Sequence, residues 1–290
     1  LKTLHPNVHG GLLATRDEKS HVNAMEKYNV KEIDLLVVNL YPFAETVRAG
    51  ADYAQCIENI DIGGPAMIRA AAKNFKYVAT LVDIEDYAGL VNELKMNNGC
   101  TSYSFRQKLS QNAFSLTAHY DAMVSNWMLD NITGVNPRRF SISAALSQDL
   151  RYGENPHQNA SFFLDEYLQG GIGASNQIQG KKLSYNNIND TDAALELVNE
   201  FPQNDGAAAV IVKHANPCGV GVADSLVEAY RSAYSCDKTS AFGGIVALNC
   251  IIDEESAREI IKVFTEVVIA PGITEGARKI FSSKSNLRLL

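Results

Sequence analysis

The stretch VIVKHANPCG (residues 210–219) ends an apolar run with a lysine followed by a histidine. The longer run AAAVIVKH (207–214) has the length and composition of a buried strand. The helical pattern DSLVEAYRSAYSCD (224–237) and the apolar run GGIVALN (243–249) follow it. This strand–helix–strand order predicts an α/β domain with a mostly parallel sheet.

Two kinds of site could explain Lys213 and His214 at a strand end. A zinc deaminase site needs a Pro-Cys-x-x-Cys pattern, but Gly221 stands where the second cysteine belongs. The residue two positions after His214 is Asn216 and not the glutamate of such sites. We therefore expect no metal. The remaining alternatives are an acid–base pair at the carboxyl end of a parallel strand, or a buried histidine satisfied by the backbone.

The composition indicates a globular protein of about two domains, with 290 residues, 46% hydrophobic and 20% charged. The net charge is −7 and no basic block is present, which argues against nucleic-acid binding. No apolar run approaches the ~18 residues of a membrane span. Five cysteines without C-x-x-C spacing indicate reduced thiols in a cytosolic protein. The chain begins with Leu1 and without a signal peptide, so we expect a piece of a longer protein.

The first half of the chain also alternates between strand and helix patterns. EIDLLVVNLYPF (32–43) and FKYVATLVD (75–83) read as strands, and residues 51–74 as a helix, a Gly-Gly break and a second helix. Residues 103–130 have helical periodicity. The polar stretch at 131–150 predicts a domain boundary near residue 145.

The segment DIGGPAMIRAAAK (61–73) is a candidate anion site. Gly63 and Gly64 precede an expected helix start, where unpaired N–H groups and the helix dipole attract phosphate. Asp61 lies before the glycines and Lys73 lies at the far end of the helix. An ordinary tight turn with a surface lysine is the alternative.

The N-terminal stretch LKTLHPNVHGG places His5 and His9 four residues apart, as for two metal ligands on a helix. Pro6 and the Gly10-Gly11 pair argue against a continuous helix. No glutamate follows His5, so the metalloprotease pattern fails. We expect loop residues here.

The loop LRYGENPHQNA (150–160) gathers functional residue types. Arg151 could clamp a phosphate or carboxamide with its planar guanidinium, and Tyr152 adds a stacking face and a hydroxyl. A polar domain entrance without a binding role is the alternative.

These stretches together resemble one protein family. They are, in chain order, LKTLHPNVHGG, NLYPF, IDIGGPAMIRAAAKN, LRYGENPHQ, KLSYNNINDTDAA, VKHANPCG, SAFGGIVALN and VVIAPG. The chain closely resembles the PurH family over its whole length. That family joins IMP cyclohydrolase to phosphoribosylaminoimidazolecarboxamide (AICAR) formyltransferase.

The resemblance implies an α/β fold with two layered domains. Residues 1–145 would form a methylglyoxal-synthase-like cyclohydrolase domain, with its N-terminal part missing before Leu1. Residues 146–290 would form a cytidine-deaminase-like transferase domain without zinc, with its C-terminal part missing.

The resemblance also implies substrates and partners. A formyl group would pass from the co-substrate 10-formyltetrahydrofolate to AICAR, and formyl-AICAR would then close to IMP with loss of water. No nucleic acid or membrane is implied, and the full-length protein would be a cytoplasmic homodimer. The alternative is a catalytically inactive fragment with residual nucleotide binding.

The family's functional residues map onto both domains. In the cyclohydrolase, Lys73 and Asp61 would move protons, while Lys2 and Tyr41 would hold the carboxamide and stabilise charge on the formyl oxygen. In the transferase, His214 would be the base and Lys213 would stabilise the intermediate. The implied substrate-binding residues are Thr3, Asn39, Gly63, Gly64, Arg151, Tyr152, Gly243 and Glu266.

Overall fold

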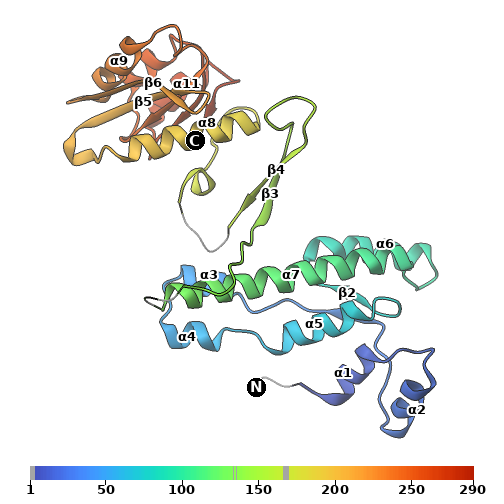
Figure 1. The fold of residues 1–290 in the computed structure, drawn as a ribbon. Helices are drawn as coiled ribbons and strands as arrows, with labels where there is room; N and C mark the ends of the chain where they lie inside the picture. Colours follow the sequence, from blue (N-terminus) through green and yellow to red (C-terminus); the bar gives the residue numbers. More distant parts are fainter. Residues whose placement is uncertain (1–3, 133, 135, 166–169) are drawn as a thin grey trace. The chain divides into compact units, whose positions relative to one another are not determined.

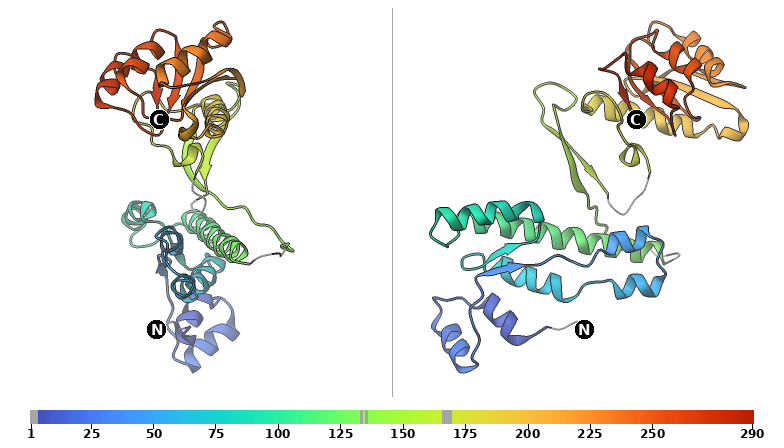
Figure 2. Two further views of the ribbon diagram at one scale, coloured as in Figure 1. Left: turned by 90° about the vertical axis from the view of Figure 1, so that its left-hand side faces the viewer. Right: turned by 180° about the vertical axis from the view of Figure 1, so that it is seen from behind.

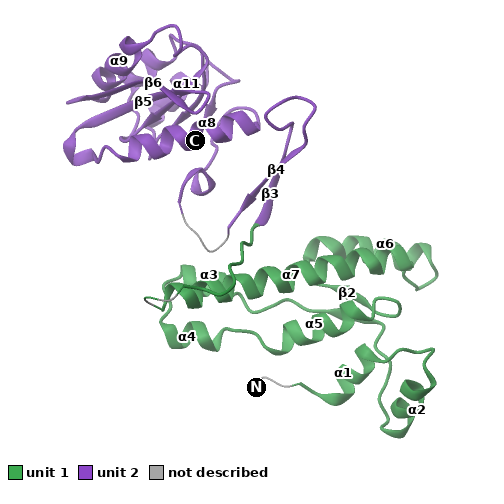
Figure 3. Cartoon of the chain, in the orientation of Figure 1, with its two compact units in different colours: residues 1–144 green, residues 145–290 purple. Residues whose placement is uncertain are grey.

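The computed structural model describes residues 4–132, 134, 136–165 and 170–290. The chain divides into two compact units, Leu1–Ala144 and Ala145–Leu290 (Figure 3). Each unit combines helices with paired strands, which confirms the expected α/β class. The assignment of a cyclohydrolase to residues 1–145 and of a transferase to residues 146–290 stays a prediction.

Unit 1 contains one parallel strand pair with helices packed on it (Figure 1). Its elements are α1 (Pro6–Leu13), α2 (Lys19–Lys27), β1 (Leu35–Val37), α3 (Phe43–Arg48), α4 (Tyr53–Glu58), α5 (Gly63–Lys73), β2 (Ala79–Leu81), a 3-10 turn (Ile84–Asp86), α6 (Tyr87–Met96) and α7 (Tyr103–Asp130). In the pair, Leu36 of β1 lies opposite Thr80 of β2. Ile68 and Ala72 of α5 pack with Ala113 of α7. The helix expected over 103–130 is confirmed.

Two expectations for unit 1 are wrong. Residues 5–13 are not a loop, because α1 begins at Pro6. Proline is favoured at a helix start, where its missing N–H has no intrahelical partner anyway, and the His5 ring accepts the Asn7 N–H at 3.2 Å. Gly63 and Gly64 do not break the chain before a helix, because they are the first two residues of α5.

Unit 2 contains a two-stranded hairpin and a five-stranded sheet. Its elements are β3 (Ala145–Leu150), β4 (Ala160–Leu164), a 3-10 turn (Ile172–Ala174), α8 (Tyr185–Asn199), a 3-10 turn (Gln203–Asp205), β5 (Ala207–Lys213), β6 (Asn216–Ala223), α9 (Leu226–Cys236), β7 (Gly244–Leu248), α10 (Glu254–Ile260), β8 (Thr265–Ile269), α11 (Glu275–Phe281) and β9 (Arg288–Leu289). The large sheet has the order β6-β5-β7-β8-β9. Helix α11 and strand β9 complete this sheet after β8.

The large sheet is mixed, so the expectation that β5 is parallel to its neighbours is wrong, whereas the strand pair of unit 1 is parallel, as expected. Strand β5 runs antiparallel to both β6 and β7, while β7, β8 and β9 are parallel. The sequence hid β6 because its proline and glycines are typical of loops. Those glycines let α9 approach the strand closely: a Cβ at Gly219 would lie 2.0 Å from the Ala233 carbonyl oxygen, and one at Gly221 would lie 2.2 Å from that of Ala229.

Helices cover both faces of this sheet (Figure 2). Side chains of β5 alternate between the faces because successive strand residues point in opposite directions. Ala209 and Ile211 pack with α9, α10 and α11 on one face, while Val210 and Val212 pack with α8 on the other. The sheet is thus buried on both faces. Residues that could bind a ligand must therefore lie at the ends of its strands.

Within the described residues, no helix combines the length and the apolar character that crossing a membrane requires.

Candidate active site

The β5–β6 turn carries the two residues that were predicted to be catalytic in the transferase. Lys213 ends β5 and pairs with Asn216, so His214 and Ala215 form a two-residue hairpin turn. Their φ angles are 52° and 56°. A left-handed conformation costs a non-glycine residue about 1–2 kcal/mol, and hairpins of this kind usually use Asn-Gly. His214 is exposed, which excludes the alternative of a buried, backbone-satisfied histidine.

Hydrogen bonds from outside the turn support this conformation. The Asp190 carboxylate, from α8, accepts the His214 N–H at 3.1 Å and the Ala215 N–H at 2.9 Å. The Asn216 side-chain amide donates to the His214 carbonyl at 2.7 Å. Each N–H group of the turn therefore has a charged acceptor, which strengthens the bond.

The turn lies where the parallel strands begin. Because β5 is antiparallel to β7, the end of β5 meets the start of β7, and the predicted placement at the carboxyl end of a parallel strand is wrong. The Lys213 ammonium donates to the Phe242 carbonyl at 2.9 Å. The next residue, Gly243, has φ 74° and donates its N–H to Phe264 at 2.7 Å. The structure thus brings Lys213, His214 and Gly243 together.

Glu266 lies on a bulge of β8 at the same edge. Gly244 pairs with Thr265 and Ile245 pairs with Val267, which leaves Glu266 as the extra residue. Its carboxylate accepts from the Asn187 side-chain amide at 3.0 Å and from the Arg288 guanidinium at 3.2 Å.

Arg151 and Tyr152 lie in the loop between β3 and β4. The Arg151 guanidinium donates to the Tyr152 hydroxyl at 3.0 Å and lies 4.7 Å from that ring's centroid. The Asn186 side chain donates to the Glu154 carbonyl at 3.3 Å, which connects this loop to the start of α8.

Helix α8 is the common support of these groups, and the sequence did not predict that role. Asn186, Asn187 and Asp190 contact the 151–159 loop, Glu266 and the β5–β6 turn, respectively. One signal could have located the helix start. Ser184 and Asn187 form a reciprocal capping box, and a serine before a helical pattern is an N-cap signal that can be read in the sequence.

In unit 1, five of the predicted residues lie in one region. The Asp61 carboxylate accepts the Gly64 N–H at 2.8 Å and the Tyr41 N–H at 3.3 Å. The Asn39 side chain donates to the Val82 carbonyl at 3.4 Å. Asn39 and Tyr41 follow the carboxyl end of β1, and Val82 follows that of β2, the edge where parallel sheets bind ligands; Asp61 is joined to this edge through Tyr41. Gly63 is next to Gly64 in the first turn of α5.

Tyr120 of α7 supports this cluster from behind. Its hydroxyl accepts the Asp61 N–H at 2.8 Å and donates to the Asn59 carbonyl at 3.3 Å. Burial raises the pKa of the Tyr120 phenol, because the charged form loses its hydration.

Of the remaining cyclohydrolase residues, only Lys73 lies in the described part of the chain, and it does not join this cluster. Lys73 is exposed at the last position of α5, ten residues from Gly63 and therefore about 15 Å along the helix axis. The structure does not bring Lys73 and Asp61 together. Lys2 and Thr3 lie outside the described residues.

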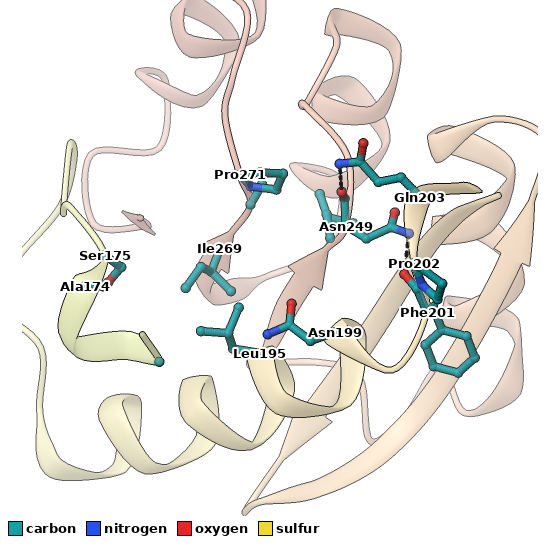
Figure 4. A pocket seen from close by; sticks show the side chains of 13 residues that line it. Ala174, Ser175, Leu195, Asn199, Phe201, Pro202, Gln203, Asn249, Ile269 and Pro271 are labelled. Carbon is teal, nitrogen blue, oxygen red and sulfur yellow. Dashed lines mark hydrogen bonds between the residues drawn. The ribbon is translucent and has the colours of Figure 1, made fainter. Parts of the chain in front are cut away.

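A pocket of about 420 Å³ lies at the opposite, carboxyl end of β7 and β8 (Figure 4). Leu195, Asn249 and Ile269 are among its lining residues. The Asn249 side chain is occupied internally, because it donates to the Phe201 carbonyl and accepts the Ala208 N–H. None of the predicted site residues that the structure describes lines this pocket. No group of three or more metal-ligating side chains occurs in the described part of the chain.

Comparisons with known proteins show the family of the chain. The profile of the AICARFT/IMPCHase bienzyme family matches residues 71–290, and that of the MGS-like domain matches residues 3–66. The chain is 61% identical over 290 residues to the bifunctional purine biosynthesis protein PurH of Dinoroseobacter shibae and 59% identical to that of Ruegeria pomeroyi. Each alignment covers 100% of this chain and 55% of the relative. The chain thus spans about half the length of these relatives, and it belongs to the AICARFT/IMPCHase bienzyme family.

Proposed function

We propose that this chain, as part of a protein of the relatives' full length, transfers a formyl group from 10-formyltetrahydrofolate to AICAR and closes formyl-AICAR to IMP. The observation that carries the transferase proposal is the exposed Lys213-His214 turn, placed beside Gly243 and linked through α8 to Glu266. Family membership supports it, because the PurH relatives are named as bifunctional purine biosynthesis proteins.

In the transfer step, His214 is proposed as the base. The AICAR amine is a weak nucleophile because its lone pair is conjugated with the ring and carboxamide. As its nitrogen bonds to the formyl carbon, the His214 imidazole takes the amine proton. The bond from that carbon to the folate nitrogen then breaks, the imidazolium of His214 gives its proton to that nitrogen, and tetrahydrofolate leaves.

Lys213 is proposed to stabilise the charge that develops on the formyl oxygen. Its ammonium has three N–H donors, of which one contacts the Phe242 carbonyl. The others can bind the oxygen as it becomes negative, and this preference for the transition state is what accelerates the reaction. Arg151 and Tyr152 would hold the nucleotide, Gly243 would let it approach the backbone, and Glu266 would make a polar contact.

In the cyclisation step, the carboxamide nitrogen attacks the formyl carbon and the formyl oxygen leaves as water. Asp61, Tyr41, Asn39, Gly63 and Gly64 would form the pocket around these atoms. Because α5 separates Lys73 from Asp61, we propose that the two side chains act on different parts of the same nucleotide. Lys2 and Thr3 complete the proposed set.

The proposed function also implies the partners, the oligomeric state and the cellular location of the enzyme. Its partners are small nucleotides and folate, with no nucleic acid and no membrane, and the full-length protein acts as a homodimer in the cytoplasm. A second candidate, a piece that binds nucleotide weakly without catalysis, is favoured by the 55% coverage of the relatives.

A formyl-transfer assay tests the proposal. It compares the 290-residue chain, a chain extended to the relatives' length, and the His214→Ala variant of the extended chain. We expect activity in the extended chain and a kcat about 10²- to 10⁴-fold lower in His214→Ala. His21→Ala, a histidine of unit 1, is the matched control and should keep the parent's kcat.

The alternatives predict other results. An inactive extended chain contradicts the proposed reaction, and full activity in His214→Ala removes His214 as the base. Activity of the 290-residue chain alone would exclude the weakly binding, non-catalytic piece.

A further inference from the structure

We propose that Asp190 is a positioning residue for His214: its carboxylate holds the β5–β6 turn in the left-handed conformation and so aims the imidazole at the substrate amine. The proposal rests on the function proposed above for His214. Asp190 does not touch the reacting atoms in this scheme. It acts only through the two N–H groups that it accepts, at 3.1 and 2.9 Å.

The turn needs such a support because its own residues disfavour its shape. Neither His214 nor Ala215 is glycine, yet φ is 52° and 56°. The usual Asn-Gly turn would hold this geometry by intrinsic preference. Here the preference is supplied by a side chain 24 positions earlier in the chain. Strain that is maintained by surrounding groups is common at functional sites.

The chemistry of the support is specific for a carboxylate. Both oxygens of Asp190 accept, and each faces one N–H group. An asparagine has the same shape but offers one acceptor oxygen and, in place of the other oxygen, an NH2 group that only donates. In Asp190→Asn, one turn N–H would face another donor. The substitution therefore removes one of the two hydrogen bonds and weakens the support, while it keeps the volume of the side chain.

The turn can relax without unfolding the sheet. Strand β5 is paired with β7 from Ala209 to Val212 and is buried on both faces up to that point. Loss of the Asp190 contacts affects the exposed residues beyond Lys213, where the candidate base lies. A fall in activity with an intact fold is thus the expected signature.

Nuclear magnetic resonance on the 290-residue chain tests the support directly. A positive φ gives a strong nuclear Overhauser effect between the Hα and HN of the same residue. We expect strong effects at His214 and Ala215 in the parent, weak ones in Asp190→Asn, and amide exchange at both positions about tenfold faster in that variant. Asp192→Asn, an exposed aspartate of the same helix, is the control and should match the parent.

Kinetics on the extended chain test the catalytic consequence. We expect Asp190→Asn to lower kcat about 10- to 100-fold, with KM for AICAR within about threefold, because only the aim of the base changes. Ala215→Gly in the Asp190→Asn background should recover part of kcat, since glycine adopts a positive φ readily. A general loss of folding would not be rescued in this way.

The outcomes separate the two proposals. Unchanged resonances at residues 214 and 215, or an unchanged kcat in Asp190→Asn, overturn the positioning role. If the extended parent transfers no formyl group, the proposed function fails, and the resonance data still decide whether Asp190 holds the turn.

Discussion

A single buried amide, that of Asn249, connects three segments of unit 2. Its oxygen accepts the Ala208 N–H at 2.7 Å, and its nitrogen donates to the carbonyls of Phe201 at 2.9 Å and Gly206 at 3.0 Å. The residue is 9% exposed. These bonds attach the α8–β5 connection to the end of β7, and water cannot easily replace them.

We expect Asn249→Ala to lower the free energy of unfolding of unit 2 by about 2–4 kcal/mol, because it leaves the Ala208 N–H and two carbonyls without partners. Hydrogen exchange of the β5 and β7 amides measures the change. Asn199→Ala is the control, because this exposed residue lines the same pocket and should shift stability by less than about 0.5 kcal/mol. Equal effects of the two substitutions would contradict the role of Asn249.

For single residues, the sequence identified side chains with unusual chemistry, but it did not predict which residues form hydrogen bonds with one another. Lys213 and His214 were singled out because their chemistry is unusual at a strand end, and the structure does place them together. Asp190 and Asn249 were missed. A lone polar residue that serves the backbone has no periodicity, and its partners are distant in sequence.

Among the elements, the turn before β7 shows how a carboxylate organises a loop. The Asp237 carboxylate accepts the Ser240 hydroxyl at 2.6 Å and the N–H groups of Ser240 and Thr239 at 2.9 and 3.1 Å. These hydrogen bonds favour the charged form, so they lower the pKa of Asp237. The turn leads directly into Phe242 and Gly243 of the candidate site.

The lowered pKa gives a pH dependence with a definite sign. The stabilisation of the turn is fully present above the unfolded pKa of Asp, about 3.9, and is lost as pH falls through the lower folded value. A carboxyl titration by NMR should therefore give a midpoint for Asp237 below about 3.9. The Ser240 amide resonance should follow the same midpoint and lose this dependence in Asp237→Asn. A midpoint above that value would contradict the assignment.

Elements were predictable where one periodicity ran over a long segment. The helix at 103–130 has the predicted bounds, because many turns of helix average out local exceptions. Strand β6 was missed, because its glycines serve contact with α9 and not strand propensity. Because β6 was not predicted, β5 was expected to run parallel to its neighbours. The site was therefore expected at the wrong end of the sheet.

On the scale of the whole molecule, each unit has a core of its own. In unit 1, Phe43 is 1% exposed and its ring centroid lies 5.4 Å from Trp127 and 6.3 Å from Tyr120. Trp127 is the only tryptophan of the chain, so its fluorescence reports on unit 1. The core clusters of unit 2 are formed by residues 172–290.

We expect Phe43→Ala to lower the free energy of unfolding of unit 1 by about 3–5 kcal/mol, through lost burial and a residual cavity. Urea titration followed by Trp127 fluorescence measures this loss, while hydrogen exchange in β5 and β7 should stay unchanged. Ile84→Ala is the control, because Ile84 is 69% exposed. If unit 2 loses protection to the same extent, the two cores are not independent.

The α/β class of both units could be predicted because hydrophobic runs and helical periodicity are local. The strand order could not, because pairing joins segments such as β5 and β7 that no local pattern relates.

The contact of β6 with α9 has a consequence for the way this sequence can diverge. Apolar side chains of the core can exchange for others of similar volume at modest cost, because neighbouring side chains readjust. At Gly219 and Gly221 the neighbour is the main chain of a helix, which is common to every sequence with this fold. Even one added methyl group would have to displace the helix itself. Over long evolutionary drift, these two positions should therefore be among the last in the sheet to accept any substitution.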